Sequence, residues 1–117
     1  MTDYSTMTDE QVNEAIFKAK GWAHGKTTPS LNFKCWYKKL PDGFIDTESD
    51  VPDYTHSWEL CGELLEEMKS ADVDLMYFKT LNKWGVDWLD NDEVEHQCVA
   101  DTPLRAICEA WLPWREQ

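Results

Sequence analysis

The sequence is poor in basic residues and has no long apolar run. Lysine and arginine number 11 against 23 aspartates and glutamates, which gives the 117-residue chain a formal net charge of −12 at pH 7. Such a charge disfavours non-specific attraction to nucleic-acid phosphates or anionic lipid. No apolar run approaches the roughly 18–20 residues that cross a bilayer, and the opening MTDYSTMTDEQ lacks the basic start and apolar core of a signal peptide. We therefore expect a soluble intracellular protein with no membrane partner and no direct nucleic-acid partner.

Paired-cysteine and glycine-rich motifs are also absent. The four cysteines, Cys35, Cys61, Cys98 and Cys108, lie far apart and form no CxxC pair. Without a secretory signal, such cysteines are expected to be reduced thiols. The sequence contains no glycine-rich phosphate loop. We expect no cofactor.

Aromatic residues, by contrast, are abundant. Hydrophobic residues make up 42% of the chain and aromatic residues 13%, with seven tryptophans. Each tryptophan can bury roughly 150–250 Å², so the acidic charge does not predict global disorder. The length fits one domain. We predict a disordered segment over residues 1–7, a single domain over 8–112, and a tail over 113–117 that begins where Pro113 ends the last helix.

Periodicity and capping patterns predict an alternation of helices and strands. Thr8 and Gln11 form a capping box, Thr55 or Ser57 can cap the second helix, and Pro103 suits the first turn of the last. The order αβαβββα predicts an α+β fold in which an antiparallel sheet of about four strands is layered between helices, an α/β/α sandwich. The predicted helices are 9–20, 56–69 and 103–112, the predicted strands are 32–39, 73–81, 84–88 and 93–100, and 46–54 is an exposed acidic connection.

Two of these strands carry informative side-chain patterns. Residues 73–81 are apolar on both alternating sets, which predicts a strand covered on both faces. After a turn at Asp90-Asn91-Asp92, period-two alternation separates the last strand into two faces. Val94, His96, Cys98 and Ala100 are predicted to share one face, and Glu93, Glu95, Gln97 and Val99 the other.

Three segments carry a family resemblance: KGWAHG after the first helix, PDYTHSWELCGELLEEM at the second, and DTPLRAICEAWL at the last. They resemble the phage ABA sandwich domain, a family of small proteins largely encoded by bacteriophages and prophages. With its spacing, the resemblance covers most of residues 8–112. It implies an antiparallel sheet layered between helices, a phage or prophage origin and the cytoplasm of a bacterial host. It implies no catalytic residue, and the 46–53 loop, the 84–88 strand and the PWREQ tail look particular to this chain.

Two alternatives involve metal or thiol chemistry. A zinc site needs about four converging ligands, and the sequence offers only His96-x-Cys98, joined at best by Cys35, His24 or His56. A core cysteine beside a hydrogen-bonded histidine explains this pair as well, so we predict no metal. A nucleophilic cysteine needs a lowered thiol pKa, whereas Cys61 and Cys108 are expected on apolar helix faces. We therefore predict no catalytic residue.

The run FKCWYKK is a third alternative. Its aromatic residues could stack on single-stranded bases while Lys34, Lys38 and Lys39 contact phosphates. The net charge opposes this interpretation, and alternation of Phe33, Cys35 and Tyr37 into the core explains the same pattern. We favour the core interpretation.

The abundant carboxylates are the remaining feature, and they suggest an acidic surface that imitates DNA and binds a host protein with a basic surface. The leading hypothesis is a non-enzymatic phage accessory protein that inhibits a defence or nucleic-acid-handling complex. The alternatives are a small interaction domain that forms homo-oligomers, and then an enzyme; exposed charge that only maintains solubility explains the same acids. The predicted partner-binding residues are Asp46, Glu48, Asp50, Asp53, Glu63, Glu67, Asp87, Asp90, Asp92, Glu93 and Glu95.

Overall fold

Helix α3 (Pro103–Glu116) lies at the centre of the hydrophobic core. The computed structural model of the protein describes residues 3–25 and 34–117. The helix begins where the Thr102 side chain accepts a hydrogen bond from the Arg105 amide at 3.1 Å. Apart from Arg105, every residue from Leu104 to Leu112 is buried. The neighbours of α3 are helices α1 (Asp9–Ala19) and α2 (Trp58–Glu67), the short 3-10 helix η2 (Tyr54–His56), and strands β5 (Lys83–Leu89) and β6 (Glu95–Ala100).

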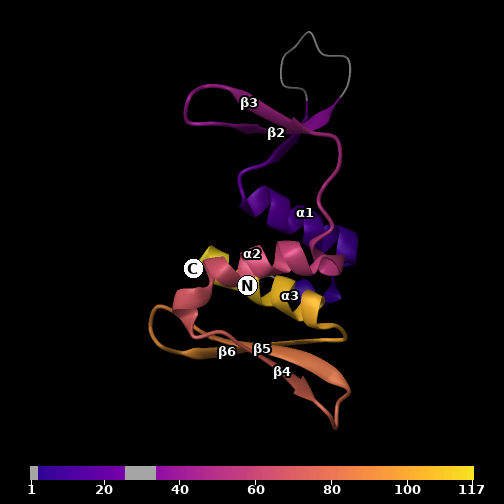
Figure 1. The fold of residues 1–117 in the computed structure, drawn as a ribbon, viewed down its shortest axis with the longest axis vertical. Helices are drawn as coiled ribbons and strands as arrows, with labels where there is room; N and C mark the ends of the chain where they lie inside the picture. The colour runs from indigo at the N-terminus through magenta and orange to yellow at the C-terminus, as the bar shows by residue number, and fades with distance from the viewer. Residues whose placement is uncertain (1–2, 26–33) are drawn as a thin grey trace.

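Two antiparallel sheets lie on opposite sides of the helices, as Figure 1 shows. The first has the order β1-β2-β3 and the second β4-β5-β6, and the molecule is elongated, with extents of 55 × 28 × 27 Å. The predicted α+β class with antiparallel strands is therefore confirmed. The remaining strands are β1 (Ala23–Gly25), β2 (Cys35–Lys39), β3 (Ile45–Glu48) and β4 (Asp74–Phe78), and two further 3-10 helices are η1 (Tyr4–Thr6) and η3 (Lys69–Ala71).

The number of strands and the order of the layers differ from the predicted sandwich. The helices lie between two three-stranded sheets instead of enclosing one sheet of about four strands. The reason is that β2 pairs with its sequence neighbours: Lys38 lies opposite Asp46 in β3, and Trp36 lies opposite His24 in β1. The predicted connection 46–54 thus contributes a strand, which the sequence hides because Ile45–Glu48 is exposed on both faces and lacks apolar alternation.

The sheet β1-β2-β3, which we call the arm, is attached to the helices by aromatic packing. The Phe17 ring of α1 stacks on Trp22 with centroids 4.6 Å apart and packs against Trp36 at 5.2 Å, and His24 packs against Trp36 at 5.0 Å. The predicted alternation into the core is therefore wrong for Tyr37, which is half-buried, since Trp36 is the aromatic residue of β2 that is buried against α1. Phe33 lies outside the described residues.

In the second sheet, one face is covered by α3 and the other is open. Trp84, Val86 and Trp88 of β5 face the core. The prediction that residues 73–81 are covered on both faces is wrong, because α3 crosses β5 and β6 but leaves β4 largely exposed. On the open face, the Phe78 ring lies over Gly85 instead, so close that a Cβ at Gly85 would be 2.4 Å from the ring.

Both chain ends are more ordered than predicted. The expected disorder of residues 1–7 does not extend to residues 3–7, since η1 buries the Tyr4 ring and Arg105 Nη2 donates to the Tyr4 carbonyl at 2.9 Å. The prediction that Pro113 ends the last helix is also wrong, because α3 continues to Glu116. Pro113 has no amide to bond the Glu109 carbonyl, and the Cys98 thiol donates to that oxygen at 3.3 Å.

Candidate partner-binding surface and pocket

The predicted acidic residues do not form one continuous surface. Figure 1 places β3 on one side of the helical layer and the β5–β6 hairpin on the other. Glu63 and Glu67 lie on α2 between them. The arm side holds Asp46, Glu48 and Asp50, and the hairpin holds Asp87, Asp90, Asp92, Glu93 and Glu95.

Several of these carboxylates are already engaged within the molecule. Asp53 accepts hydrogen bonds from Asn13 at 3.0 Å and Thr55 at 2.9 Å, and pairs with His56 at 3.0 Å. Burial opposes its ionisation, but these bonds outweigh burial and hold the pKa of the Asp53 carboxyl below its ordinary value. Such a residue supports the fold and offers little to a partner. Glu67 pairs with Lys20 at 2.9 Å, and Asp87 accepts from Gln97 at 2.8 Å.

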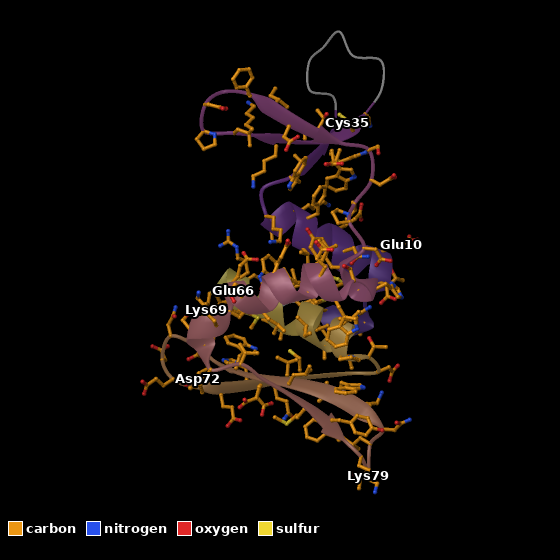
Figure 2. The ribbon with its side chains drawn as sticks, viewed as in Figure 1. Glu10, Cys35, Glu66, Lys69, Asp72 and Lys79 are labelled. Carbon is orange, nitrogen blue, oxygen red and sulfur yellow. The ribbon has the colours of Figure 1, made fainter. Side chains whose placement is uncertain are left out.

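Figure 2 shows the same kind of pairing at the end of α2, where Glu66 and Lys69 lie together. Their charged atoms are 2.9 Å apart, and both side chains are largely exposed. Pairs of this kind contribute little to stability. They do reduce the local negative charge, so that the acids of α2 are partly neutralised by nearby lysines.

The turn between β5 and β6 is organised by Asp90. Its Oδ1 accepts from the amides of Asp92 and Val94, both at 2.9 Å, while its Oδ2 lies 2.8 Å from His96 Nε2. The His96 contact and then the Val94 amide hold the pKa of the Asp90 carboxyl below its ordinary value. The Gln117 side chain accepts from the Asn91 amide at 3.1 Å and ties the turn to α3.

This turn presents three acids to solvent. Asp92, Glu93 and Glu95 are exposed, and within residues 3–25 and 34–117 their side chains make no hydrogen bond or ion pair. Glu93 has a left-handed backbone with φ 61°, a conformation that few non-glycine residues adopt. We call residues 90–95 the acidic turn. It holds three exposed carboxylates of the predicted surface close together on a turn that Asp90 fixes.

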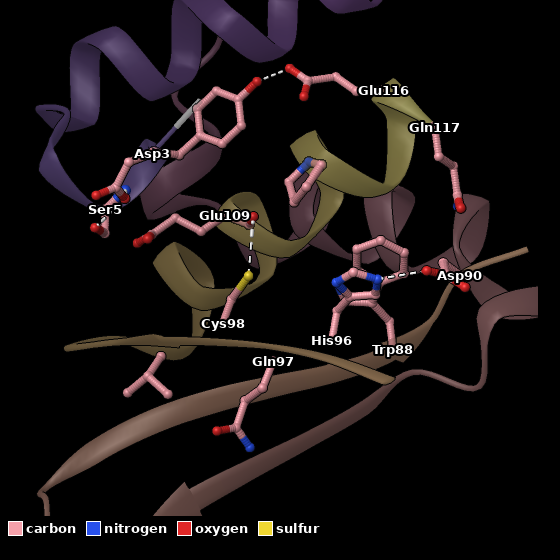
Figure 3. A pocket seen from close by; sticks show the side chains of 13 residues that line it. Asp3, Ser5, Trp88, Asp90, His96, Gln97, Cys98, Glu109, Glu116 and Gln117 are labelled. Carbon is pink, nitrogen blue, oxygen red and sulfur yellow. Dashed lines mark hydrogen bonds and ion pairs between the residues drawn. The ribbon is translucent and has the colours of Figure 1, made fainter. Parts of the chain in front are cut away.

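A cavity of about 610 Å³ lies beside the acidic turn, between η1, β6 and the C-terminal half of α3 (Figure 3). We call it the His96 pocket. The His96 ring stacks on Trp88 with centroids 4.4 Å apart and an interplanar angle of 15°. The described lining residues contain no lysine or arginine, whereas four carboxylates line the cavity: Asp3, Asp90, Glu109 and Glu116.

Glu109 is the most buried of these four acids. Its side chain is 8% exposed, and its Oε2 accepts from Arg105 Nε at 2.9 Å. Burial raises the pKa of the Glu109 carboxyl, while the charge of Arg105 acts in the opposite direction. Glu116 accepts a hydrogen bond from the Tyr4 hydroxyl, and Asp3 Oδ1 accepts from the Ser5 amide at 3.0 Å.

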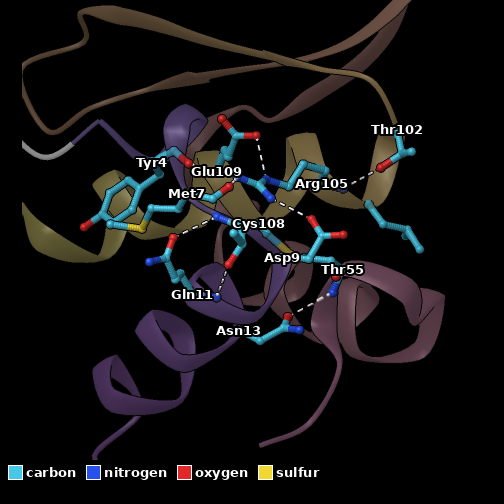
Figure 4. Close-up of polar contacts among 12 residues, drawn as sticks. Tyr4, Met7, Asp9, Gln11, Asn13, Thr55, Thr102, Arg105, Cys108 and Glu109 are labelled. Carbon is cyan, nitrogen blue, oxygen red and sulfur yellow. Dashed lines mark hydrogen bonds and ion pairs between the residues drawn. The ribbon is translucent and has the colours of Figure 1, made fainter.

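Arg105 holds the N-terminal segment beside this cavity, and Figure 4 shows its polar contacts. Besides Glu109, its guanidinium contacts Asp9 at 2.6 Å and donates to the carbonyls of Tyr4 and Met7 at 2.9 and 2.6 Å. One side chain of α3 therefore holds both η1 and the start of α1 in place. A second hollow of about 470 Å³ is lined by Arg105 itself and by Asp9, His56 and Lys83, among others.

The thiols near these hollows are arranged for packing. Burial and the charge of Glu109 raise the pKa of the Cys98 thiol to about 11, so it remains protonated at neutral pH. Cys61 and Cys108 are fully buried with their sulfurs 3.8 Å apart. A hydrogen bond with Cys61 and burial raise the pKa of the Cys108 thiol. The same hydrogen bond lowers the pKa of the Cys61 thiol, whose side chain is fully buried in the core.

The residues considered for metal binding are not brought together. Among residues 3–25 and 34–117, no three histidine, cysteine, aspartate or glutamate side chains are placed to hold a metal ion. His96 pairs with Asp90, Cys98 bonds a backbone carbonyl, and Cys35 lies in the arm.

The same described residues contain no helix that has both the length and the apolar character needed to cross a membrane.

Sequence reasoning missed the acids that approach the pocket from outside the hairpin. Asp3 falls in the segment predicted to be disordered and Glu116 in the predicted tail, so neither is among the predicted site residues. The ion pair of Glu109 could have been predicted, because Arg105 and Glu109 are four residues apart and side chains at that spacing meet on one face of a helix. The position of that pair beneath η1 depends on tertiary packing and has no local pattern.

Comparison with known proteins extends only to the fold. No family model matches the sequence. No curated protein matches it either. The structure is similar to the crystal structure of a phage protein from Bacillus cereus ATCC 14579, with a TM-score of 0.66, 18% sequence identity, and coverage of 97% of this chain and 98% of that chain. At this identity the likeness establishes a shared fold over the whole length.

Proposed function

We propose that this protein is a non-enzymatic phage accessory protein whose acidic turn binds a basic surface of a host protein. The observation that carries the proposal is the cluster of exposed, unengaged carboxylates at Asp92, Glu93 and Glu95 on a fixed turn. A turn held by Asp90 and Gln117 loses little freedom on binding, which favours affinity. The fold shared with a phage protein supports the phage setting.

Electrostatics favour a basic partner over other classes. With a net charge of −12, the protein repels nucleic acid and other acidic macromolecules, whereas a basic groove that normally holds DNA attracts it. Complementary charge chiefly accelerates association and selects the partner. Inhibition of a defence or nucleic-acid-handling complex follows if the acidic turn occupies the place of the phosphates.

The proposal is tested by affinity capture from bacterial lysate at low and at physiological salt. We expect a basic protein to be retained at low salt and partly released at higher salt, because screening weakens exposed ion pairs. The triple variant Asp92→Asn, Glu93→Gln, Glu95→Gln is expected to lose that protein. The triple variant Asp46→Asn, Glu48→Gln, Asp50→Asn removes the same charge from the arm and is the matched control.

The two variants decide between a local site and general charge. Loss of capture only with the acidic-turn variant supports the proposal. Equal loss with both variants indicates a diffuse charge effect, and unchanged capture with both contradicts a role for the acidic turn.

A second candidate function is self-association through β4. Leu75 and Tyr77 face the same side of the sheet as the buried Val86 and the half-buried Trp84, yet they are 38% and 47% exposed because α3 does not reach them. Light scattering on the same preparations separates the candidates. An apolar dimer is expected to persist at high salt and to dissociate in the Tyr77→Ser variant. Electrostatic capture of a basic protein is expected to weaken at high salt and to be unaffected by Tyr77→Ser.

A further inference from the structure

The His96 pocket is unusual in its balance of hydrogen-bonding groups. Four carboxylates line it and no lysine or arginine does among the described residues, although Glu109 is paired with Arg105, which lies outside the lining. Within the described part of the chain, Glu109 Oε1 and one oxygen of Glu116 accept no hydrogen bond. The cavity therefore has spare acceptors and negative charge, which match a ligand rich in N–H donors.

His96 adds a further acceptor and a flat surface. Its Nε2 bonds Asp90 at 2.8 Å, as Figure 3 shows. In the neutral ring this contact places the proton on Nε2 and leaves Nδ1 as an acceptor. The ring is stacked on Trp88, so it is held flat at the cavity wall, and planar cations stack well on such surfaces.

Trp88 forms the wall behind the His96 ring, on which it stacks. Trp88 lines the cavity and is 3% exposed, but its indole Nε1 has almost no accessible surface and no hydrogen-bond partner in the described structure. The indole N–H is therefore a reporter of changes at the cavity wall and does not donate to a molecule in the cavity.

We infer that the His96 pocket binds a guanidinium group, and that its natural source is an arginine side chain of a partner protein. A guanidinium meets the spare carboxylate oxygens of Glu109 and Glu116 and stacks on His96, and Arg is the side chain best suited to such planar, multidentate contacts. The net charge of −12 favours a basic partner protein as the source of that arginine. The inference rests on the proposed function only for the source of the arginine.

The test is titration of the ¹⁵N-labelled protein with N-acetyl-arginine amide, followed by NMR. We expect shifts confined to the pocket, namely the Trp88 indole Nε1–H and the amides of Gln97, Glu109 and Gln117. N-acetyl-citrulline amide has nearly the same shape without the charge and is expected to cause no shift at equal concentration. Equal shifts from both probes would overturn the assignment, as would arginine-induced shifts that centre outside the pocket.

Variants locate the binding energy. Glu116→Gln keeps an acceptor for the Tyr4 hydroxyl but removes the charge, and we expect it to weaken arginine binding by up to about fivefold. Glu63→Gln makes the same charge change on α2, outside the pocket, and is expected to leave the affinity unchanged. Equal weakening by both variants would contradict a local site. Native chemical-shift dispersion in each variant verifies that the fold is intact.

A final comparison of ligands distinguishes the source of the guanidinium. Agmatine represents a free small molecule and lacks the carbonyls of a peptide. Binding of N-acetyl-arginine amide at least as tight as that of agmatine supports a protein side chain, whereas much tighter agmatine binding overturns that source. If the capped arginine binds while no basic protein is captured from lysate, the pocket stands and the proposed function fails. If a basic protein is captured while the capped arginine does not bind, the proposed function stands and the pocket has no part in it.

Discussion

Asp53 illustrates how a single residue can look functional in sequence and serve the fold in three dimensions. It lies in an acidic loop, but its carboxylate joins α1 to η2 through Asn13, Thr55 and His56. The hydrogen bond with Asp53, and then the charge of that carboxylate, raise the pKa of His56 above 6.5. The pair therefore links the protonation of an exposed histidine to the packing of two helical segments.

This linkage predicts a defined pH dependence. Because the folded pKa of His56 is raised, its stabilising contribution is complete below pH 6.5 and is lost as the pH rises through the raised value. The Asp53 contribution has the opposite sign, since its pKa is lowered: it is present above pH 3.8 and is lost as the pH falls through the lowered value. An NMR titration of His56 should give a pKa above 6.5.

Asp53→Asn should return the pKa of His56 to near 6.5, because it removes both the charge and the charge-assisted bond. Asp92→Asn removes one charge from the acidic turn and serves as the control, with no expected effect on His56. A His56 pKa that does not change in Asp53→Asn would contradict the assigned pairing.

At the scale of elements, two glycines differ in what surrounds them. Gly62 lies on an exposed part of α2, and a methyl group added there would meet no heavy atom within 4 Å, whereas Gly85 lies in β5 directly under the Phe78 ring. Gly62 lies in a helix interior, where glycine lowers stability and serves no packing purpose. Gly85 occupies a position where the absence of a side chain lets two strands and an aromatic ring pack together.

Substitution by alanine should therefore have opposite effects at these positions. Gly62→Ala should raise the free energy of unfolding by up to about 1 kcal/mol through helix propensity. Gly85→Ala should lower it by about 1–3 kcal/mol, because the Phe78 ring must move. Urea unfolding of both variants measures the difference. Stabilisation by Gly85→Ala would show that the ring moves aside at little cost.

The elements that the sequence predicted well are those determined by local patterns. The capping box of Thr8 and Gln11, the Ser57 cap of α2 and the start of α3 at Pro103 depend on residues within one turn. The continuation of α3 past Pro113 could not be predicted, because the free carbonyl is satisfied by a thiol from β6. The same applies to β3 and to the pocket, which depend on pairings between segments that carry no pattern of their own.

For the whole molecule, the arm accounts for the elongated shape. The Cα radius of gyration is 16.0 Å, compared with about 13 Å for a compact domain of this length. The arm is attached to the helices mainly through Phe17, Trp22 and Trp36, whereas α3 is covered by α1, α2 and the second sheet. Regions with few buried contacts open more readily than the core.

Native-state hydrogen exchange should therefore be faster in β2 and β3 than in α3, by at least about tenfold, which corresponds to roughly 1.4 kcal/mol of opening free energy. Trp36→Ala should accelerate exchange in the arm and leave α3 nearly unchanged. Uniform acceleration across both regions would show that the arm and the helices unfold as one cooperative unit.

The position of the arm also bears on how many molecules this protein can hold at once. The tip of the arm exposes Phe44, at 71%, and Ile45, at 41%, on the far side of the helical layer from the acidic turn. A protein seated on the acidic turn leaves that tip uncovered. In the proposed function, the basic partner occupies one end of the molecule, and the apolar tip at the other end stays exposed in the complex.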